Sequence, residues 1–136
     1  MDDSAARERL SEARVARLAT VGAAGKPHLV PVTFALDGDI LYFAVDAKPK
    51  RTRVLQRLRN IEANPSVCLL VDHYDEDWSR LWWVRVDGTA RIIDNPSEAD
   101  QAIDRLVDRY PQYRRQRPAG PAVAVSIGRI SGWSSS

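Results

Sequence analysis

The sequence is poor in metal-binding and disulfide-forming residues, and it contains no long apolar run. Cys68 is the one cysteine, which excludes an internal disulfide, and with only His28 and His73 beside it a protein-built metal site is not expected. A membrane-spanning helix needs about 20 consecutive apolar residues, and no stretch approaches that length. The acidic start, Met1-Asp2-Asp3, differs from the basic start of a secretory signal peptide. We therefore expect a cytoplasmic protein without a metal centre or a membrane partner.

Motifs that carry chemistry by themselves are also missing. The sequence has no GxGxxG or GxxxxGK[ST] phosphate loop and no GxSxG nucleophile elbow. The acids from Asp75 to Asp77 are interpreted as a solvated loop, and neither histidine has the local neighbours of a Ser-His-Asp triad. No catalytic nucleophile or general base is identified, so an enzyme with this sequence is expected to rely on a cofactor for its chemistry.

The composition is that of a single globular domain covering residues 1–136. The chain is 44% hydrophobic and 28% charged, with a formal net charge of +2. This balance argues against a nucleic-acid-binding module, which would also lose binding steeply with added salt. The charges are nevertheless segregated. Six cations and no acid lie between Lys48 and Arg59, and an acidic patch follows at residues 72–77.

Periodicity predicts three helices among a larger number of strands. Asp3 or Ser4 is a plausible N-cap of the first helix, Asn64-Pro65 ends the second, and residues 110–117 are expected to be irregular or a short helical turn. The predicted helices cover residues 4–16, 52–63 and about 95–109. The predicted strands cover residues 17–21, 28–36, 40–45, 66–72, 81–93 and 121–133.

The order of these elements favours a mainly β (α+β) fold over a doubly wound parallel sheet. Strands joined by hairpins dominate, with a tight turn at residues 37–39 and a kink or bulge expected near Gly88. We therefore expect an antiparallel sheet closed into a small barrel with helices outside. Pro31 removes a ladder donor from its strand, which indicates an edge position or a bulge. Alternatively, the backbone at residues 31–33 approaches a ligand and reads the edge of its ring.

The basic segment is the first candidate site. Three cations come just before the predicted helix start at Thr52, where the positive pole of the helix dipole disfavours them unless an anion binds. Backbone N–H groups, the Thr52 hydroxyl and basic side chains could converge there on a phosphate. A solvated basic loop is the alternative interpretation. The candidate anion-binding residues are Lys48, Lys50, Arg51, Thr52, Arg57 and Asn60.

The second candidate site is a cluster of three tryptophans between Asp77 and Trp83. Strand alternation places Trp82 on one face with Val84, and Trp83 on the other face with Arg85. One tryptophan is thus expected in the core, while the other could form a flat wall for a planar ring or a subunit contact. Packing without any ligand contact is the alternative for each of them.

Taken in order, these segments resemble the pyridoxamine 5′-phosphate oxidase-like split-barrel family. The similarity covers about residues 5–133, and its spacing is closest to the actinobacterial branch of flavin/deazaflavin oxidoreductases that use coenzyme F420. The stretches that carry it are RLAT (17–20), KPHLVPVTF (26–34), LYFA (41–44), NIEANP (60–65), WWVRV (82–86) and GTAR (88–91).

The resemblance implies a six-stranded split β-barrel of the FMN-binding type, which forms a homodimer with two cofactor sites at the interface. It implies that the cofactor phosphate is held by Lys48, Lys50, Arg51, Thr52 and Arg57. The ring system would lie along Pro31, Val32 and Thr33, with Trp82 and Trp83 completing the pocket. The chain ends soon after Trp133, without the extension that pyridoxamine phosphate oxidases use for their substrate, so oxidation of vitamin B6 is not expected.

We therefore expect an F420-dependent oxidoreductase that transfers a hydride between reduced deazaflavin and a small electron-poor molecule. The cationic segment suits the phosphodiester and polyglutamate tail of F420, and FMN is the alternative cofactor. A second hypothesis is a binding or carrier protein for FMN, haem or a tetrapyrrole without redox turnover, with His28 or His73 as a haem ligand.

Overall fold

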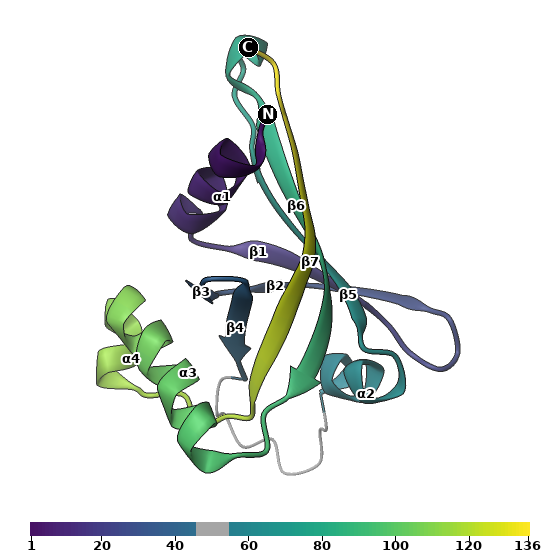
Figure 1. Cartoon of the computed structure of the whole chain (residues 1–136), viewed down its shortest axis with the longest axis vertical. Coiled ribbons are helices and arrows are strands. Elements are labelled where there is room, and N and C mark those ends of the chain that lie inside the picture. The colour runs from purple at the N-terminus through teal and green to yellow at the C-terminus, as the bar shows by residue number, and fades with distance from the viewer. Residues whose placement is uncertain (46–54) are drawn as a thin grey trace.

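The computed structural model describes residues 1–45 and 55–136, which form one antiparallel sheet with flanking helices (Figure 1). The helices are α1 (Asp3–Glu12), α2 (Gln56–Ala63), α3 (Pro96–Arg109) and α4 (Pro111–Arg115), with a 3₁₀ turn η1 (Trp78–Arg80). The strands are β1 (Ala16–Val21), β2 (Pro27–Val32), β3 (Ala35–Asp37), β4 (Ile40–Ala44), β5 (Ser66–His73), β6 (Trp82–Ile92) and β7 (Ala122–Ser134).

The sheet has the strand order β2-β1-β5-β6-β7-β4-β3, and each neighbouring pair is antiparallel. Its two edge strands, β2 and β3, follow each other in the chain with only Thr33 and Phe34 between them. Three Cα–Cα steps span at most about 11 Å, so the edges must come together and the sheet must curl. The predicted antiparallel split barrel is confirmed, with the strand expected at residues 28–36 divided into β2 and β3.

The division at Phe34 has a clear cause in its backbone hydrogen bonds. The Phe34 N–H donates to the Tyr110 hydroxyl (3.2 Å), and its carbonyl accepts from Arg109 Nη1 (2.8 Å) and from the same hydroxyl (3.0 Å). Arg109 also donates through Nη2 to the carbonyl of Ser11 (2.7 Å) and to that of Ala13. Side chains at the end of α3 therefore take the place of a neighbouring strand.

The main core lies inside the curl of the sheet. Alternating residues of the strands face it, such as Leu18 and Leu69, which are paired across β1 and β5 and fully buried. Ala6 and Leu10 of α1 are buried in the same cluster. This helix therefore covers part of the core that the sheet alone would leave open.

The other face of the sheet, here called the outer face, is only partly covered by a helix. Ala102 and Ile103 of α3 pack against Tyr42 and Ala124, which belong to β4 and β7. The part of the outer face beyond α3 carries exposed apolar side chains: Leu29, Trp83 and Trp133 are 67%, 36% and 45% exposed. An exposed surface of this kind marks a binding or subunit interface.

The irregularity expected near Gly88 is present. The pairing of β6 with β7 shifts between Asp87, which lies opposite Arg129, and Gly88, which lies opposite Ile127. A Cβ at Gly88 would stand 2.6 Å from the Ser126 carbonyl oxygen, so only glycine fits this close approach.

Two details of the predicted helices are corrected. Asp2 caps α1 by accepting the N–H of Ala5 (2.8 Å), in place of Asp3 or Ser4. The helix predicted to begin at residue 52 begins instead at Gln56, because Leu55 is extended and packs against the core. Residues 111–115 form the short helix α4, which confirms the helical alternative for residues 110–117. None of the helices in residues 1–45 and 55–136 has the length and apolar content that a membrane crossing requires.

Replacing Tyr110 by Phe tests the hydrogen bonds that hold the Phe34 backbone between β2 and β3. The loss of the hydroxyl leaves a buried N–H without its acceptor, so Tyr110→Phe should lower the free energy of unfolding by about 1–3 kcal/mol in urea denaturation. Tyr113→Phe is the matched control. It removes one hydrogen bond to the half-buried Thr33 hydroxyl (2.7 Å) and should cost only about 0.5–1.5 kcal/mol. Equal losses in the two variants would contradict a special role for Tyr110.

Candidate functional site

A groove on the outer face is the most apolar candidate site. Trp83 and Trp133 stand opposite each other on β6 and β7, and Leu70 and Cys68 of β5 continue the same surface. The cavity has a volume of about 550 Å³. That volume lies within the usual range of about 300–1,000 Å³ for small-molecule sites, and the flat tryptophan rings suit a planar group. We call this cavity the outer groove.

Charged groups lie among the apolar ones at the outer groove. Arg85 is paired with Asp87 of its own strand, with Nε 3.2 Å from Oδ2. Burial, and next the charge of Asp87, raise the pKa of the Cys68 thiol above its ordinary value. Cys68 is therefore kept as a neutral thiol near pH 7, and the groove gains no nucleophile from it.

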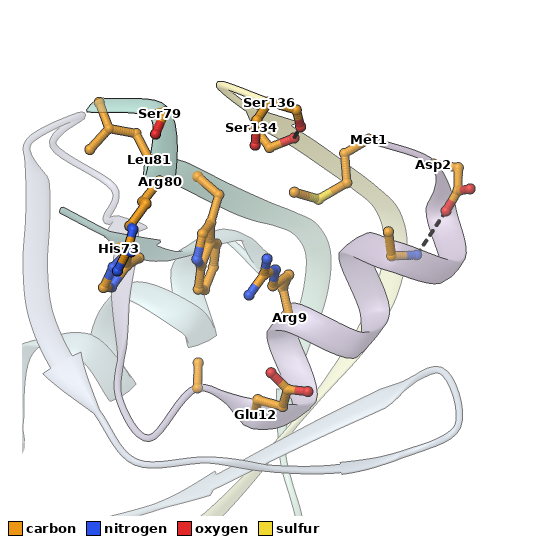
Figure 2. A pocket seen from close by; sticks show the side chains of 13 residues that line it. Met1, Asp2, Arg9, Glu12, His73, Ser79, Arg80, Leu81, Ser134 and Ser136 are labelled. Carbon is orange, nitrogen blue, oxygen red and sulfur yellow. Dashed lines mark hydrogen bonds between the residues drawn. The ribbon is translucent and has the colours of Figure 1, made fainter. Parts of the chain in front are cut away.

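A second hollow lies between α1 and the far end of the β5–β6 hairpin (Figure 2). We call it the N-terminal pocket; it has a volume of about 800 Å³, and Arg9, His73, Arg80 and Trp82 are among its lining residues. The Arg9 guanidinium carbon lies 5.1 Å from the centre of the Trp82 ring, and the His73 ring stacks on the same indole at 6.2 Å. Trp82 and His73 also line the outer groove, so the two cavities share a wall.

The predicted ring-binding strand sends its three residues in different directions. Pro31 is exposed on the edge strand β2, in a row across the sheet with Arg17 and Leu70, which places it on the outer face. Val32 is buried in the main core, at 8% exposure. Thr33 is half-buried beyond the strand, bonded to Tyr113. The expected edge position of Pro31 is confirmed.

The predicted anion-binding residues are only partly visible. Lys48, Lys50, Arg51 and Thr52 lie outside the described residues. Arg57 is half-buried on α2. Asn60 faces the sheet at 3% exposure, where its amide donates to the Thr20 hydroxyl (3.0 Å) and accepts from Gln56 (2.8 Å).

The cationic helix and the tryptophans lie at opposite ends of β5. This strand begins at Ser66, three residues after α2, and ends at His73, which is paired with Trp82. At the usual rise per residue, the two ends are roughly 20 Å apart. Figure 1 shows the same separation, with α2 near one end of the molecule and the tip of the β5–β6 hairpin near the other. Within the described residues, α2 and the tryptophans are therefore separated by the length of β5.

A family model described as pyridoxamine 5′-phosphate oxidase matches residues 3–134. The chain belongs to the pyridoxamine 5′-phosphate oxidase family. The sequence resemblance is thus confirmed at the level of the family, while the F420-dependent branch stays a prediction. No curated protein matches the chain.

Solved structures share the fold at low sequence identity. Rv2991, a conserved hypothetical protein from Mycobacterium tuberculosis, has a TM-score of 0.78 and 22% identity over 99% of this chain and 86% of its own. A FAD-binding protein from Mesorhizobium loti has a TM-score of 0.74 and 22% identity, covering 97% and 94%. HutZ, a heme storage protein from Vibrio cholerae, has a TM-score of 0.74 and 17% identity, covering 97% and 93%.

In this member of the oxidase family, the N-terminal pocket is the feature that sequence patterns do not reveal. Arg9 belongs to a short charged helix, and its contact with Trp82 joins distant parts of the chain, so no local spacing singles it out. The one available signal is composition: Arg, His and Trp are the side chains that stack on one another. Within the described residues, no group of three or more His, Cys, Asp or Glu could hold a metal ion.

The buried contacts of Asn60 generate a stability prediction. Asn60→Ala leaves the buried Thr20 hydroxyl without this partner, so the free energy of unfolding should fall by about 1–3 kcal/mol in the cofactor-free protein. Thr20→Val, which keeps the volume, tests the same bond from the other side and should also destabilise. An Asn60→Ala protein as stable as the parent would show that this amide is free for a ligand.

Proposed function

We propose that this protein is an F420-dependent oxidoreductase that works as a homodimer. The observation that carries the proposal is the outer groove, a tryptophan-lined cavity on an uncovered sheet face, in a chain of the pyridoxamine 5′-phosphate oxidase family. A neighbour of the same fold is a FAD-binding protein, which makes a related tricyclic ring a reasonable ligand here.

The residues present fit such a cofactor in their chemistry. Trp83, Trp133 and Leu70 offer flat apolar surface for a ring system. The stretch between Lys48 and Arg59 supplies six cations for a phosphodiester and an acidic tail, more than the single phosphate of FMN requires. When bound, reduced F420 supplies a hydride to an electron-poor acceptor. The protein's own contribution is to hold the ring, exclude water and bind the anionic tail.

The proton that accompanies hydride transfer is assigned to solvent. The polar side chains beside the tryptophans include Arg85, which is paired with Asp87. They also include Asp72 and His73 at the end of β5, and Tyr74 just beyond it. These side chains are exposed to water, so solvent itself can supply the proton. The acceptor is a small molecule whose reduction is driven by orientation rather than by acid catalysis.

The homodimer follows from the separation along β5. The chain leaves α2 close to the start of β5, whereas Trp83 is paired near the end of that strand, so a ring on Trp83 and an anion at α2 are better served by two chains. A second copy packed on the outer face would bring its cationic helix to the tryptophans of the first. It would also bury Leu29, Trp83 and Trp133, whose exposure is costly for a monomer.

A charge on the outer face should break the dimer. Leu70 lies in the middle of this face, so Leu70→Arg would bury an unpaired cation and should convert a particle of about twice 15.2 kDa in sedimentation to a monomer. Gln101→Arg, on the exposed side of α3, is the matched control and should remain a dimer. A parent protein that sediments as a monomer at working concentration would contradict the proposal.

Cofactor identity and the anion clamp can be tested by titration. We expect F420 to quench the tryptophan fluorescence and to bind more tightly than FMN or haem. Arg51→Ala should weaken F420 binding about 10- to 150-fold, because hydrogen bonds to charged groups contribute about 1.5–3 kcal/mol. Arg115→Ala, at the exposed end of α4, is the control. Tighter binding of FMN or haem than of F420 would favour the alternative function, a protein that binds one of those cofactors. An Arg51→Ala variant with unchanged F420 affinity would show that Arg51 does not bind the cofactor phosphate.

A further inference from the structure

The N-terminal pocket is distinct from the outer groove. It opens between α1 and the β5–β6 hairpin (Figure 2). Strand alternation places Trp82, which lines it, on the same face of β6 as the core residues Val84 and Val86. Its volume of about 800 Å³ is that of a site for a small organic molecule. We propose that this pocket binds a small planar carboxylate, with Arg9 as the residue that recognises the carboxyl group.

Arg9 is held ready for such a ligand. Its guanidinium carbon lies 5.1 Å from the centre of the Trp82 ring, a cation–π contact. Among the described residues, the Arg9 guanidinium donates no side-chain hydrogen bond, so its N–H groups are available to a ligand. Within the part of the chain that the structure describes, no carboxylate lies within ion-pair distance of Arg9. A guanidinium with open in-plane donors pairs best with a carboxylate, which it binds through two parallel hydrogen bonds.

The aromatic wall explains why the ligand should be planar. Trp82 is half-buried against the core, and the His73 ring stacks on it with an angle of 18° between the planes. His73 is itself near Asp75, with Nε2 3.7 Å from Oδ2. The indole is thus held from several sides, and together with Leu81 it gives the pocket a rigid apolar wall beside the Arg9 donors.

The other charges in the pocket define what would compete with the ligand. Arg80 adds a second cation, although it also lies 3.7 Å from Asp77. Asp2 already accepts the Ala5 N–H as the N-cap of α1. Glu12 is the remaining acid, and Figure 2 shows it on the Arg9 side of the pocket. An incoming carboxylate would be repelled by Glu12, so removing this charge should strengthen binding.

The experiment uses 4-nitrobenzoate as the probe, with binding measured by calorimetry on the full-length protein. Arg9→Gln should weaken binding at least tenfold, and Glu12→Gln should strengthen it about two- to fivefold. The neutral analogue 4-nitrobenzamide should bind at least tenfold more weakly than the acid. Arg85→Gln is the matched control, since it makes the same change in the outer groove, and it should leave the affinity unchanged.

Three results would overturn the proposal: an Arg9→Gln protein that binds like the parent, equal affinity for the acid and the amide, or a loss of binding in Arg85→Gln alone. The melting temperature of each variant is measured in parallel. If Arg9→Gln does not fold, Arg9→Lys decides. It keeps the charge but lacks the planar fork, so it should weaken binding severalfold, and an unchanged affinity would refute recognition by the guanidinium.

Discussion

The two-residue crossing at Thr33 and Phe34 is the constraint on which the barrel depends. The chain must pass from one edge of the sheet to the other within these two residues, so the backbone of Phe34 has no strand on which to pair. Arg109 and Tyr110 supply the missing partners, and through Ser11, Ala13 and Arg14 they also fasten the end of α1. The hydrogen bonds of these two side chains therefore link closure of the sheet, placement of α1 and docking of α3.

Closing the sheet decides which surface is left for function. The inner face is filled by alternating side chains from the strands and by α1, while α3 covers the outer face only over β4 and the near part of β7. Among the described residues, no helix covers the part of the outer face that carries Leu29, Trp83 and Trp133, and large apolar side chains exposed in this way mark an interface. The uncovered face is where a second subunit, a cofactor or both can pack.

Local patterns predicted the elements well, since they depend on neighbours in the chain. Asn95 and Pro96 mark the start of α3, and the alternation around Val84 and Val86 marks β6. The start of α2 was placed too early because the apolar residues Leu55, Leu58 and Ile61 have helical spacing, whereas the packing of the extended Leu55 against the core is a tertiary contact. Asn60 was expected in a ligand groove for a similar reason. Its partner Thr20 lies on β1, far from Asn60 in the sequence, and no local residue spacing predicts that contact.

The adjacent residues Trp82 and Trp83 show how strand alternation creates two sites from one sequence motif. The pleat sends Trp83 into the outer groove and Trp82 toward the N-terminal pocket, although Trp82, His73 and Leu81 border both cavities. A ligand that moves any of these three side chains changes the shape of both cavities, since a packed wall has few alternative arrangements. The two cavities are therefore separated by a single layer of side chains and not by a further element of the fold. Helix α2 lies near the other end of β5, away from the wall that the two cavities share.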